Sequence, residues 1–153
     1  MEYGLLVQQA HEMIKDSTWE ITMLSNLSAL LYTSLDRINW AGFYIIRNGE
    51  LVLGPFQGKP ACIRIPKGKG VCGAAVEDRK IVQISDVDKF PGHIVCDSDS
   101  KSEIVLPIFV GNEVWGVLDI DSPVTGRFDD TDELFLSEIV HQLEHYIAPL
   151  VII

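Results

Sequence analysis

Two pairs of turn residues constrain the fold more than any other feature of the sequence. Asn48-Gly49 and Gly111-Asn112 each lie between two runs that are rich in β-branched or aromatic residues. Asn and Gly tolerate the positive φ angles of tight two-residue turns, so each pair predicts a β-hairpin. Because such a short turn can join only antiparallel strands, the sequence predicts an antiparallel sheet.

The predicted strands of this sheet are short, and successive side chains along each strand point to opposite faces. They are predicted at residues 39–47, 50–53, 81–84, 104–110 and 113–121. The period of two places Trp40 and Tyr44 on one face of the first strand, and Asp119 and Asp121 on one face of the last. We expect the second strand to end before Gly54-Pro55, because both residues disfavour a strand interior.

Helices are predicted before the first strand and after the last strand in the sequence. Apolar residues recur at helical spacing over residues 1–16, 20–35 and 129–147. Ser17-Thr18-Trp19-Glu20 has the form of a capping box, which predicts the start of the second helix. A Gly-rich turn at 67–70 leads into a short helix. The chain is therefore predicted to be one α+β domain, residues 1–153, with helices covering one face of the sheet.

Charge and cysteine count exclude several classes of function. The chain has 22 acidic and 12 basic residues, for a net charge of −10. A surface of this sign repels phosphate backbones and anionic lipids, so we expect neither nucleic-acid nor membrane binding. No secretory signal pattern or long apolar run occurs. An odd number of cysteines, three, indicates a reducing compartment, and we expect the protein to be cytoplasmic.

Cys96 is the first candidate for chemistry, because it lies outside any predicted strand or helix. It follows the turn at Pro91-Gly92 within a stretch rich in Asp and Ser. Reactive thiols occupy polar and partly exposed sites, whereas structural thiols are buried. Cys96 is therefore a candidate nucleophile. The alternative is a solvated loop with an incidental thiol.

Acidic and aromatic residues form a second candidate group. Asp119 and Asp121 share a strand face, and the group includes Glu103, Trp40 and Tyr44. Polar groups that converge on an aromatic wall are typical of small-molecule sites. We expect a small acidic pocket for a cationic group, although two acids near a strand end are also common at a solvated edge.

Three further motifs favour structural interpretations. Residues 68–73 match G-x-G-x-x-G, but a dinucleotide site requires a parallel crossover that this chain lacks. Cys72 nonetheless lies near a predicted helix start, where the dipole favours its thiolate. The H-x-x-E-H pattern at 141–145 has no third zinc ligand after it, and the cysteines with His93 lack the close spacing of a structural zinc site.

Six ordered blocks of the sequence closely resemble the free methionine-(R)-sulfoxide reductases, which are stand-alone GAF-domain enzymes. The blocks are residues 39–44, 53–58, 70–73, 93–97, 102–105 and 118–123. The resemblance implies a GAF-like fold, with a central antiparallel sheet of about six strands and the N- and C-terminal helices packed on one face. It also implies reduction of free methionine (R)-sulfoxide, with no metal or organic cofactor.

The same resemblance assigns roles to individual residues. It places the nucleophile on Cys96 and the resolving cysteine on Cys62, with Cys72 as an alternative resolver. The substrate-pocket residues fall on Trp40, Tyr44, Glu103, Asp119 and Asp121. Glu103 or Asp121 is the candidate proton donor.

A cycle of thiol chemistry follows from these roles. Attack by Cys96 on the sulfoxide leaves a sulfenic acid, which condenses with a second cysteine to give an intramolecular disulfide. Thioredoxin is the expected reductant of that disulfide. The resemblance also allows for a homodimer.

Two alternatives stay open from the sequence. A non-catalytic GAF module that senses a small ligand, such as a cyclic nucleotide, would share the fold, but three cysteines at these positions have no role in a pure sensor. Acids near Cys96 also oppose its thiolate, because negative charges raise a thiol pKa. Either the acids are partly protonated, or His93 and Lys101 offset them.

Overall fold

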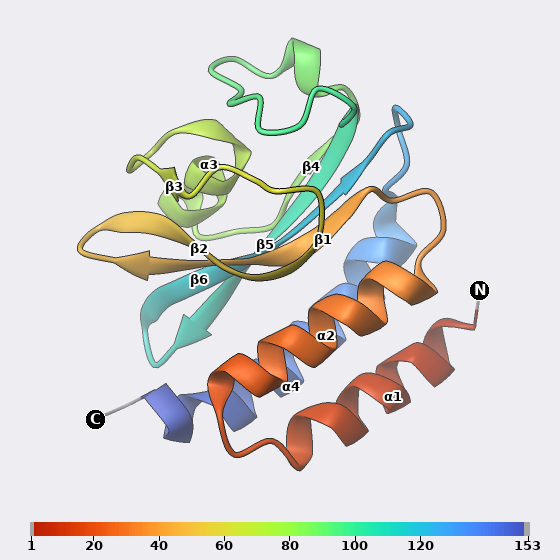
Figure 1. Ribbon diagram of the computed structural model, residues 1–153, viewed down its shortest axis with the longest axis vertical. Helices are drawn as coiled ribbons and strands as arrows, with labels where there is room; N and C mark the ends of the chain where they lie inside the picture. Colours follow the sequence, from red (N-terminus) through yellow and green to blue (C-terminus); the bar gives the residue numbers. More distant parts are fainter. Residues whose placement is uncertain (1, 152–153) are drawn as a thin grey trace.

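A computed structural model describes residues 2–151, which form a six-stranded antiparallel sheet with helices on both faces (Figure 1). The strand order is β3-β2-β1-β6-β5-β4. The strands are β1 (Trp40–Arg47), β2 (Glu50–Gly58), β3 (Arg64–Ile65), β4 (Val82–Ile84), β5 (Ser102–Val110) and β6 (Glu113–Ser122). The α+β prediction is confirmed, while residues 1, 152 and 153 of the predicted domain lie outside the described part.

Three helices lie on one side of the sheet, as predicted, two of them against the strands and the N-terminal one packed outside those two. They are α1 (Tyr3–Lys15), α2 (Glu20–Ser34) and α4 (Asp130–Val151), and Figure 1 shows them together below the strands. Alternate residues of β1, such as Ala41 and Phe43, are fully buried in the core beneath these helices. Within residues 2–151, no helix combines the length and apolar character that a membrane span requires.

The opposite face is covered by the short helix α3 (Gly70–Asp78) and by the loop between β4 and β5, which includes the 3₁₀ turn η1 (Val87–Lys89). Trp40 and Tyr44 point to this side and belong to a second buried cluster that includes Cys72 of α3. The alternation predicted for β1 is therefore confirmed. It separates a helix-covered core from a smaller face with loops and an acidic site.

Both predicted hairpins are present, but β2 continues beyond its predicted end. Gly42 pairs with Phe56 and Tyr44 pairs with Leu53, so a single β1 residue faces Gly54 and Pro55 together. This irregularity is a β-bulge, and a bulge is a position where a sheet accepts a proline. The strand passes through Pro55 to Gly58, and the prediction that it ends at residue 53 is wrong.

The predicted capping box is also wrong, although the helix that it was meant to start is present. The Ser17 hydroxyl donates to the carbonyl of Met13 at 2.8 Å and so bonds to the end of α1. No side-chain hydrogen bond caps α2, which Trp19 precedes in an extended conformation. Ser17 therefore satisfies a carbonyl in the last turn of the preceding helix, because a serine hydroxyl can also bond backward by one turn.

We predict that Gly42→Ala destabilises the protein by roughly 1–3 kcal/mol, because a methyl group overpacks this site. A Cβ at Gly42 would collide with the Phe56 side chain and lie 2.8 Å from Trp40 Cη2. Urea unfolding followed by tryptophan fluorescence measures the change. Gly111→Asn is the control, because φ at Gly111 is +64°, space there is open and Asn tolerates this conformation. Equal stability of the two variants would contradict the prediction.

Candidate active site

Sheet register brings three carboxylic acids together on the α3 face. Asp121 of β6 pairs with Trp40 on one side and with Glu103 of β5 on the other. Asp119 lies two residues before Asp121 on the same face, opposite Gly42. Glu103 and Asp119 are only 6% and 5% exposed. Sequence periodicity placed Asp119 and Asp121 on one strand face but could not relate them to Glu103, and the register brings all three into one cluster.

The cluster holds protons that isolated carboxyl groups would lose. Burial raises the pKa of Glu103 well above its ordinary value, and the negative charges of Asp119 and Asp121 raise it further. Burial likewise raises the pKa of Asp119 and of Asp121, the latter with help from the charge of Asp119. Three carboxylates this close, two of them buried and Asp121 half-buried, do not all ionise together.

One oxygen of the cluster has an unused hydrogen-bonding capacity. Among the described residues, Asp119 Oδ1 is buried without a hydrogen-bond partner. A buried acceptor without a donor is unfavourable by about 1–3 kcal/mol. The site is therefore suited to a ligand that brings its own donor, and a cationic donor suits an acidic cluster best.

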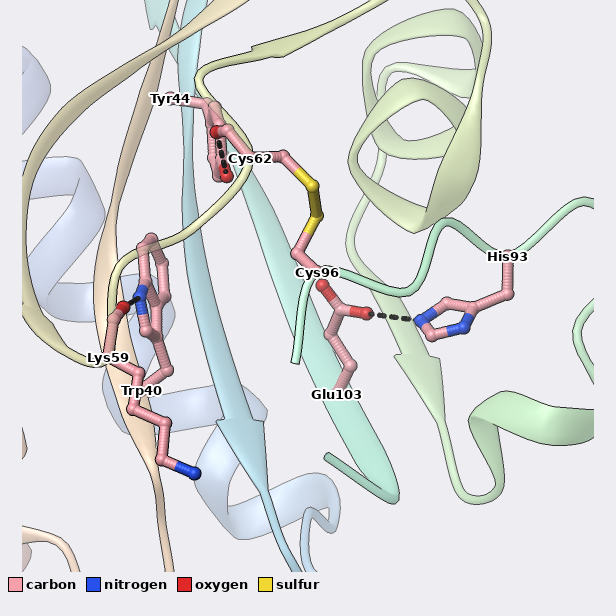
Figure 2. The surroundings of a disulfide bond; sticks show 7 residues. All are labelled: Trp40, Tyr44, Lys59, Cys62, His93, Cys96 and Glu103. Carbon is pink, nitrogen blue, oxygen red and sulfur yellow. Dashed lines mark hydrogen bonds and ion pairs between the residues drawn. A yellow bond between two sulfur atoms is a disulfide. The ribbon is translucent and has the colours of Figure 1, made fainter. Parts of the chain in front are cut away.

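An aromatic wall stands beside the acids. The Trp40 ring stacks on Tyr44 with 5.9 Å between centroids and on Phe56 with 5.2 Å. The Trp40 indole N–H donates to the Lys59 carbonyl at 3.2 Å, and the Tyr44 hydroxyl donates to the Cys62 carbonyl at 2.8 Å. Figure 2 shows both bonds, which tie the segment after β2 to the wall.

A disulfide joins Cys62 to Cys96 across this face (Figure 2). The two residues are 34 positions apart in sequence, with 5.4 Å between their Cα atoms. Both are half-buried, and Cys96 lines the same cavity as Glu103. The loop cysteine singled out by its polar surroundings therefore has a second cysteine within bonding distance.

Cys72 has a different environment from the other two cysteines. It is a buried free thiol on α3, and its sulfur lies within 4.8 Å of ligand atoms of Glu103 and Asp119. Burial, followed by the charge of Asp119, raises the pKa of the Cys72 thiol well above its ordinary value. The expectation that the helix start favours a Cys72 thiolate is wrong, because burial and the acids outweigh the dipole.

The structure also bears on the metal alternatives. Cys62 and Cys96 are joined to each other, which removes the donors of the three-cysteine zinc site considered from sequence. Within residues 2–151, the donor set close enough to hold a cation is Cys72, Glu103 and Asp119. These atoms belong to the acid cluster itself.

His93 supplies a basic group to the acid cluster. Its Nε2 lies 3.9 Å from Glu103 Oε1, and both side chains are largely buried (Figure 2). The pKa of the exposed Asp99 is lowered chiefly by its ion pair with Lys59, and Lys101, the other basic residue considered from sequence, contributes a smaller part there. His93 is therefore the side chain that can offset the negative charge near Cys96.

Two contacts that hold the Cys96 loop were not found from sequence. The Asn39 side-chain amide donates to Asp97 at 3.2 Å and to the Ser100 hydroxyl at 3.1 Å. Lys59 forms an ion pair with Asp99 at 2.7 Å. The polar amide of Asn39, directly before a buried strand, was the sequence signal that could have indicated its role. The Lys59–Asp99 pair had no such signal, because only the tertiary structure brings the two residues together.

A cavity that opens to solvent lies at the centre of these groups. Its lining of acids and aromatic rings, rather than its size, is what suits a small molecule. Predicted site residues in its lining are Trp40, Tyr44, Cys72, Cys96, Glu103, Asp119 and Asp121. The arrangement can bind a small cation between acids and an aromatic wall, beside a redox-active pair of sulfurs.

The chain matches known proteins along nearly its whole length. The GAF domain family matches residues 10–147. The free methionine-R-sulfoxide reductase of Escherichia coli (strain K12) is 53% identical over 95% of this chain and 88% of that protein. The structure titled fRMsr of Staphylococcus aureus, in complex with substrate, is 54% identical, covers 96% of both chains and has a TM-score of 0.92.

A third similar protein is the free methionine-R-sulfoxide reductase of Neisseria meningitidis, solved in complex with its substrate. It is 41% identical, with a TM-score of 0.94 over 97% of this chain and 89% of that chain. The likeness therefore extends over sequence and fold together.

We predict that stability falls as pH rises above about 4.5, because the cluster's folded pKa values exceed those of the unfolded chain. Stability from the retained protons is fully present below the unfolded pKa and is lost as pH rises through the folded pKa. Each retained proton contributes a slope of about 1.4 kcal/mol per pH unit.

Glu103→Gln removes one of these groups and should flatten the curve. Urea unfolding at pH 5, 6, 7 and 8, with the disulfide oxidised, measures the slope. Glu113→Gln, the same change at the exposed start of β6, is the control and should follow the wild type. Parallel curves for Glu103→Gln and the wild type would contradict the prediction.

Proposed function

The chain belongs to the GAF-domain family and, within it, to the free methionine-R-sulfoxide reductases, and from this premise we propose how it carries out that reduction. Cys96 takes the oxygen from free methionine (R)-sulfoxide, and Cys62 resolves the oxidised Cys96. One observation carries the proposal: the Cys62–Cys96 disulfide lies at a cavity that combines an aromatic wall with buried acids.

The acids and the aromatic wall bind opposite ends of the substrate. Free methionine sulfoxide carries an ammonium group, which supplies both the positive charge and the donor that Asp119 Oδ1 lacks among the described residues. Asp121 and Glu103 complete the acidic surround, and the one that is ionised adds negative charge beside the ammonium group. The methyl-sulfinyl end packs against Trp40, because sulfur and methyl groups contact aromatic rings favourably.

Reduction begins when the Cys96 thiolate attacks the sulfoxide sulfur. The sulfoxide oxygen takes a proton from a carboxylic acid, and Glu103 or Asp121 is the donor because burial raises the pKa of each. The oxygen passes to Cys96 as a sulfenic acid, and methionine is released. The substrate sulfur gains the two electrons that Cys96 loses.

Cys62 then attacks the Cys96 sulfenic acid, which forms the disulfide and releases water. Cys62 fits this role because its Cα lies 5.4 Å from that of Cys96. Cys72 fits it less well, since its buried thiol has a raised pKa and attack requires the thiolate. A thioredoxin dithiol then reduces the disulfide by exchange. This cycle suits the reducing cytoplasm, where we place the protein.

A coupled thioredoxin assay with four substrates tests the proposed activity. The R and S epimers of methionine sulfoxide are offered free and within a peptide, and only the free R epimer should support turnover. Cys96→Ser should reduce the rate by at least about 10³-fold, since a serine hydroxyl is a far weaker nucleophile.

A thiol count separates the enzyme from a ligand sensor. The reduced protein should lose two thiols per chain when free methionine (R)-sulfoxide is added without reductant. A sensor would lose none, and that result, or full activity of Cys96→Ser, would overturn the proposal.

We predict that Cys62→Ser completes one turnover and then stops, because its Cys96 sulfenic acid has no resolving partner. Rapid quench should give about one methionine per chain, while steady-state turnover with thioredoxin falls by about 100-fold or more. Cys72→Ser is the matched control and should retain turnover. Sustained wild-type turnover by Cys62→Ser would show that another group resolves Cys96.

A further inference from the structure

Large apolar side chains flank both halves of the disulfide and face solvent. Ile63 follows Cys62 and is 72% exposed, and Val95 precedes Cys96 and is 65% exposed. With 5.4 Å between the two cysteine Cα atoms, the Cα atoms of Ile63 and Val95 are at most about 13 Å apart. They form a small apolar surface around the sulfurs, which we call the disulfide rim.

The exposure of the rim is imposed by the fold around it. The Ile63 carbonyl accepts a hydrogen bond from the Leu53 N–H of β2 at 3.0 Å, and β3 begins at the next residue. Next to Val95, Ile94 packs near Gly70 at the start of α3. Contacts on each side of the disulfide therefore hold the neighbouring backbone and leave the two side chains outside.

Positive charge gathers on the Cys62 side of the rim, whereas Asp97 and Asp99 follow Cys96 on the other side. Residues 59–69 contain four basic side chains and no acid, whereas the net charge of the chain is −10. Lys59 is paired with Asp99, while Arg64, Lys67 and Lys69 are exposed on the segment that carries Cys62. A partner that covers the rim therefore meets a basic border and is favoured by acidic groups of its own.

We propose that the disulfide rim and its basic border are the docking surface for a protein dithiol reductant, whose reactive thiol lies in an apolar patch bordered by acids. The inference rests on the proposed function and adds the surface that the reductant recognises. A protein must cover residues 63 and 95 to bring its sulfur against the disulfide, and it gains from burying them. A small dithiol reaches the sulfurs without covering them.

The exchange on this surface is balanced. One reductant thiolate attacks one sulfur of the Cys62–Cys96 bond, forms a mixed disulfide and releases the other cysteine, which takes a proton. The second reductant thiolate then closes the reductant's own disulfide and releases the remaining cysteine. Two electrons pass from the dithiol to the protein.

The test compares two reductants on the same variants. Ile63→Ser, Val95→Ser and the double variant are assayed with free methionine (R)-sulfoxide, once with thioredoxin and once with dithiothreitol. The double variant should raise KM for thioredoxin about tenfold, the effect of losing about 1.4 kcal/mol of binding. Its rate with dithiothreitol and its KM for the sulfoxide should match the wild type.

Leu134→Ser is the matched control, since Leu134 is 66% exposed on α4, away from the disulfide. It should leave KM for thioredoxin unchanged. A wild-type KM for thioredoxin in the double variant would overturn the docking surface, as would an equal loss with both reductants. Absence of dithiothreitol-driven turnover in the wild type would instead overturn the proposed function.

Discussion

The burial of three carboxyl groups on neighbouring strands is the constraint on which the rest of the site depends. Glu103, Asp119 and Asp121 lie together because the register of β1, β6 and β5 aligns them. Their mutual repulsion and desolvation oppose folding unless protons or a cation compensate. The helix-covered core on the other face supplies the apolar burial that lets the sheet tolerate this cluster.

The two faces of the sheet accordingly have different roles: the helix side supplies most of the apolar core, and the other side holds the site. The helix side consists of long elements with a continuous apolar core, whereas the site side has the two-residue β3, the short α3 and a long loop. On the site side, the Cys62–Cys96 bond joins the segment before β3 to the loop between β4 and β5. Reduction removes that covalent link while Asn39 and Lys59 still hold the loop by polar contacts. The reactive sulfur can therefore change partner while the acid cluster stays on rigid strands.

Local patterns predicted the elements well, and tertiary contacts account for what they missed. Turn chemistry at Asn48-Gly49 identified a hairpin, because that preference is a property of two residues alone. The prediction that β2 ends before Pro55 was wrong, because the strand accepts this proline at a bulge opposite β1. Cys72 was misread because its burial beside acids is a property of the packed state. Periodicity placed Asp119 and Asp121 on one face, but only the register of the strands brings Glu103 to them. The resemblance to known reductases supplied the grouping that local patterns could not.

In the proposed reaction, the acid cluster explains both the choice of a free amino acid and the timing of the chemistry. A peptide-bound residue has a neutral amide in place of the ammonium group, so its binding would leave buried acids without a cation. The same acids oppose formation of the Cys96 thiolate while the pocket holds no cation. Arrival of the ammonium group offsets their charge, which favours the Cys96 thiolate just as the sulfoxide comes within reach. His93, 3.9 Å from Glu103, can supply part of this offset beforehand. The nucleophile is then most reactive when the correct substrate occupies the pocket, because the substrate carries the charge that the site lacks.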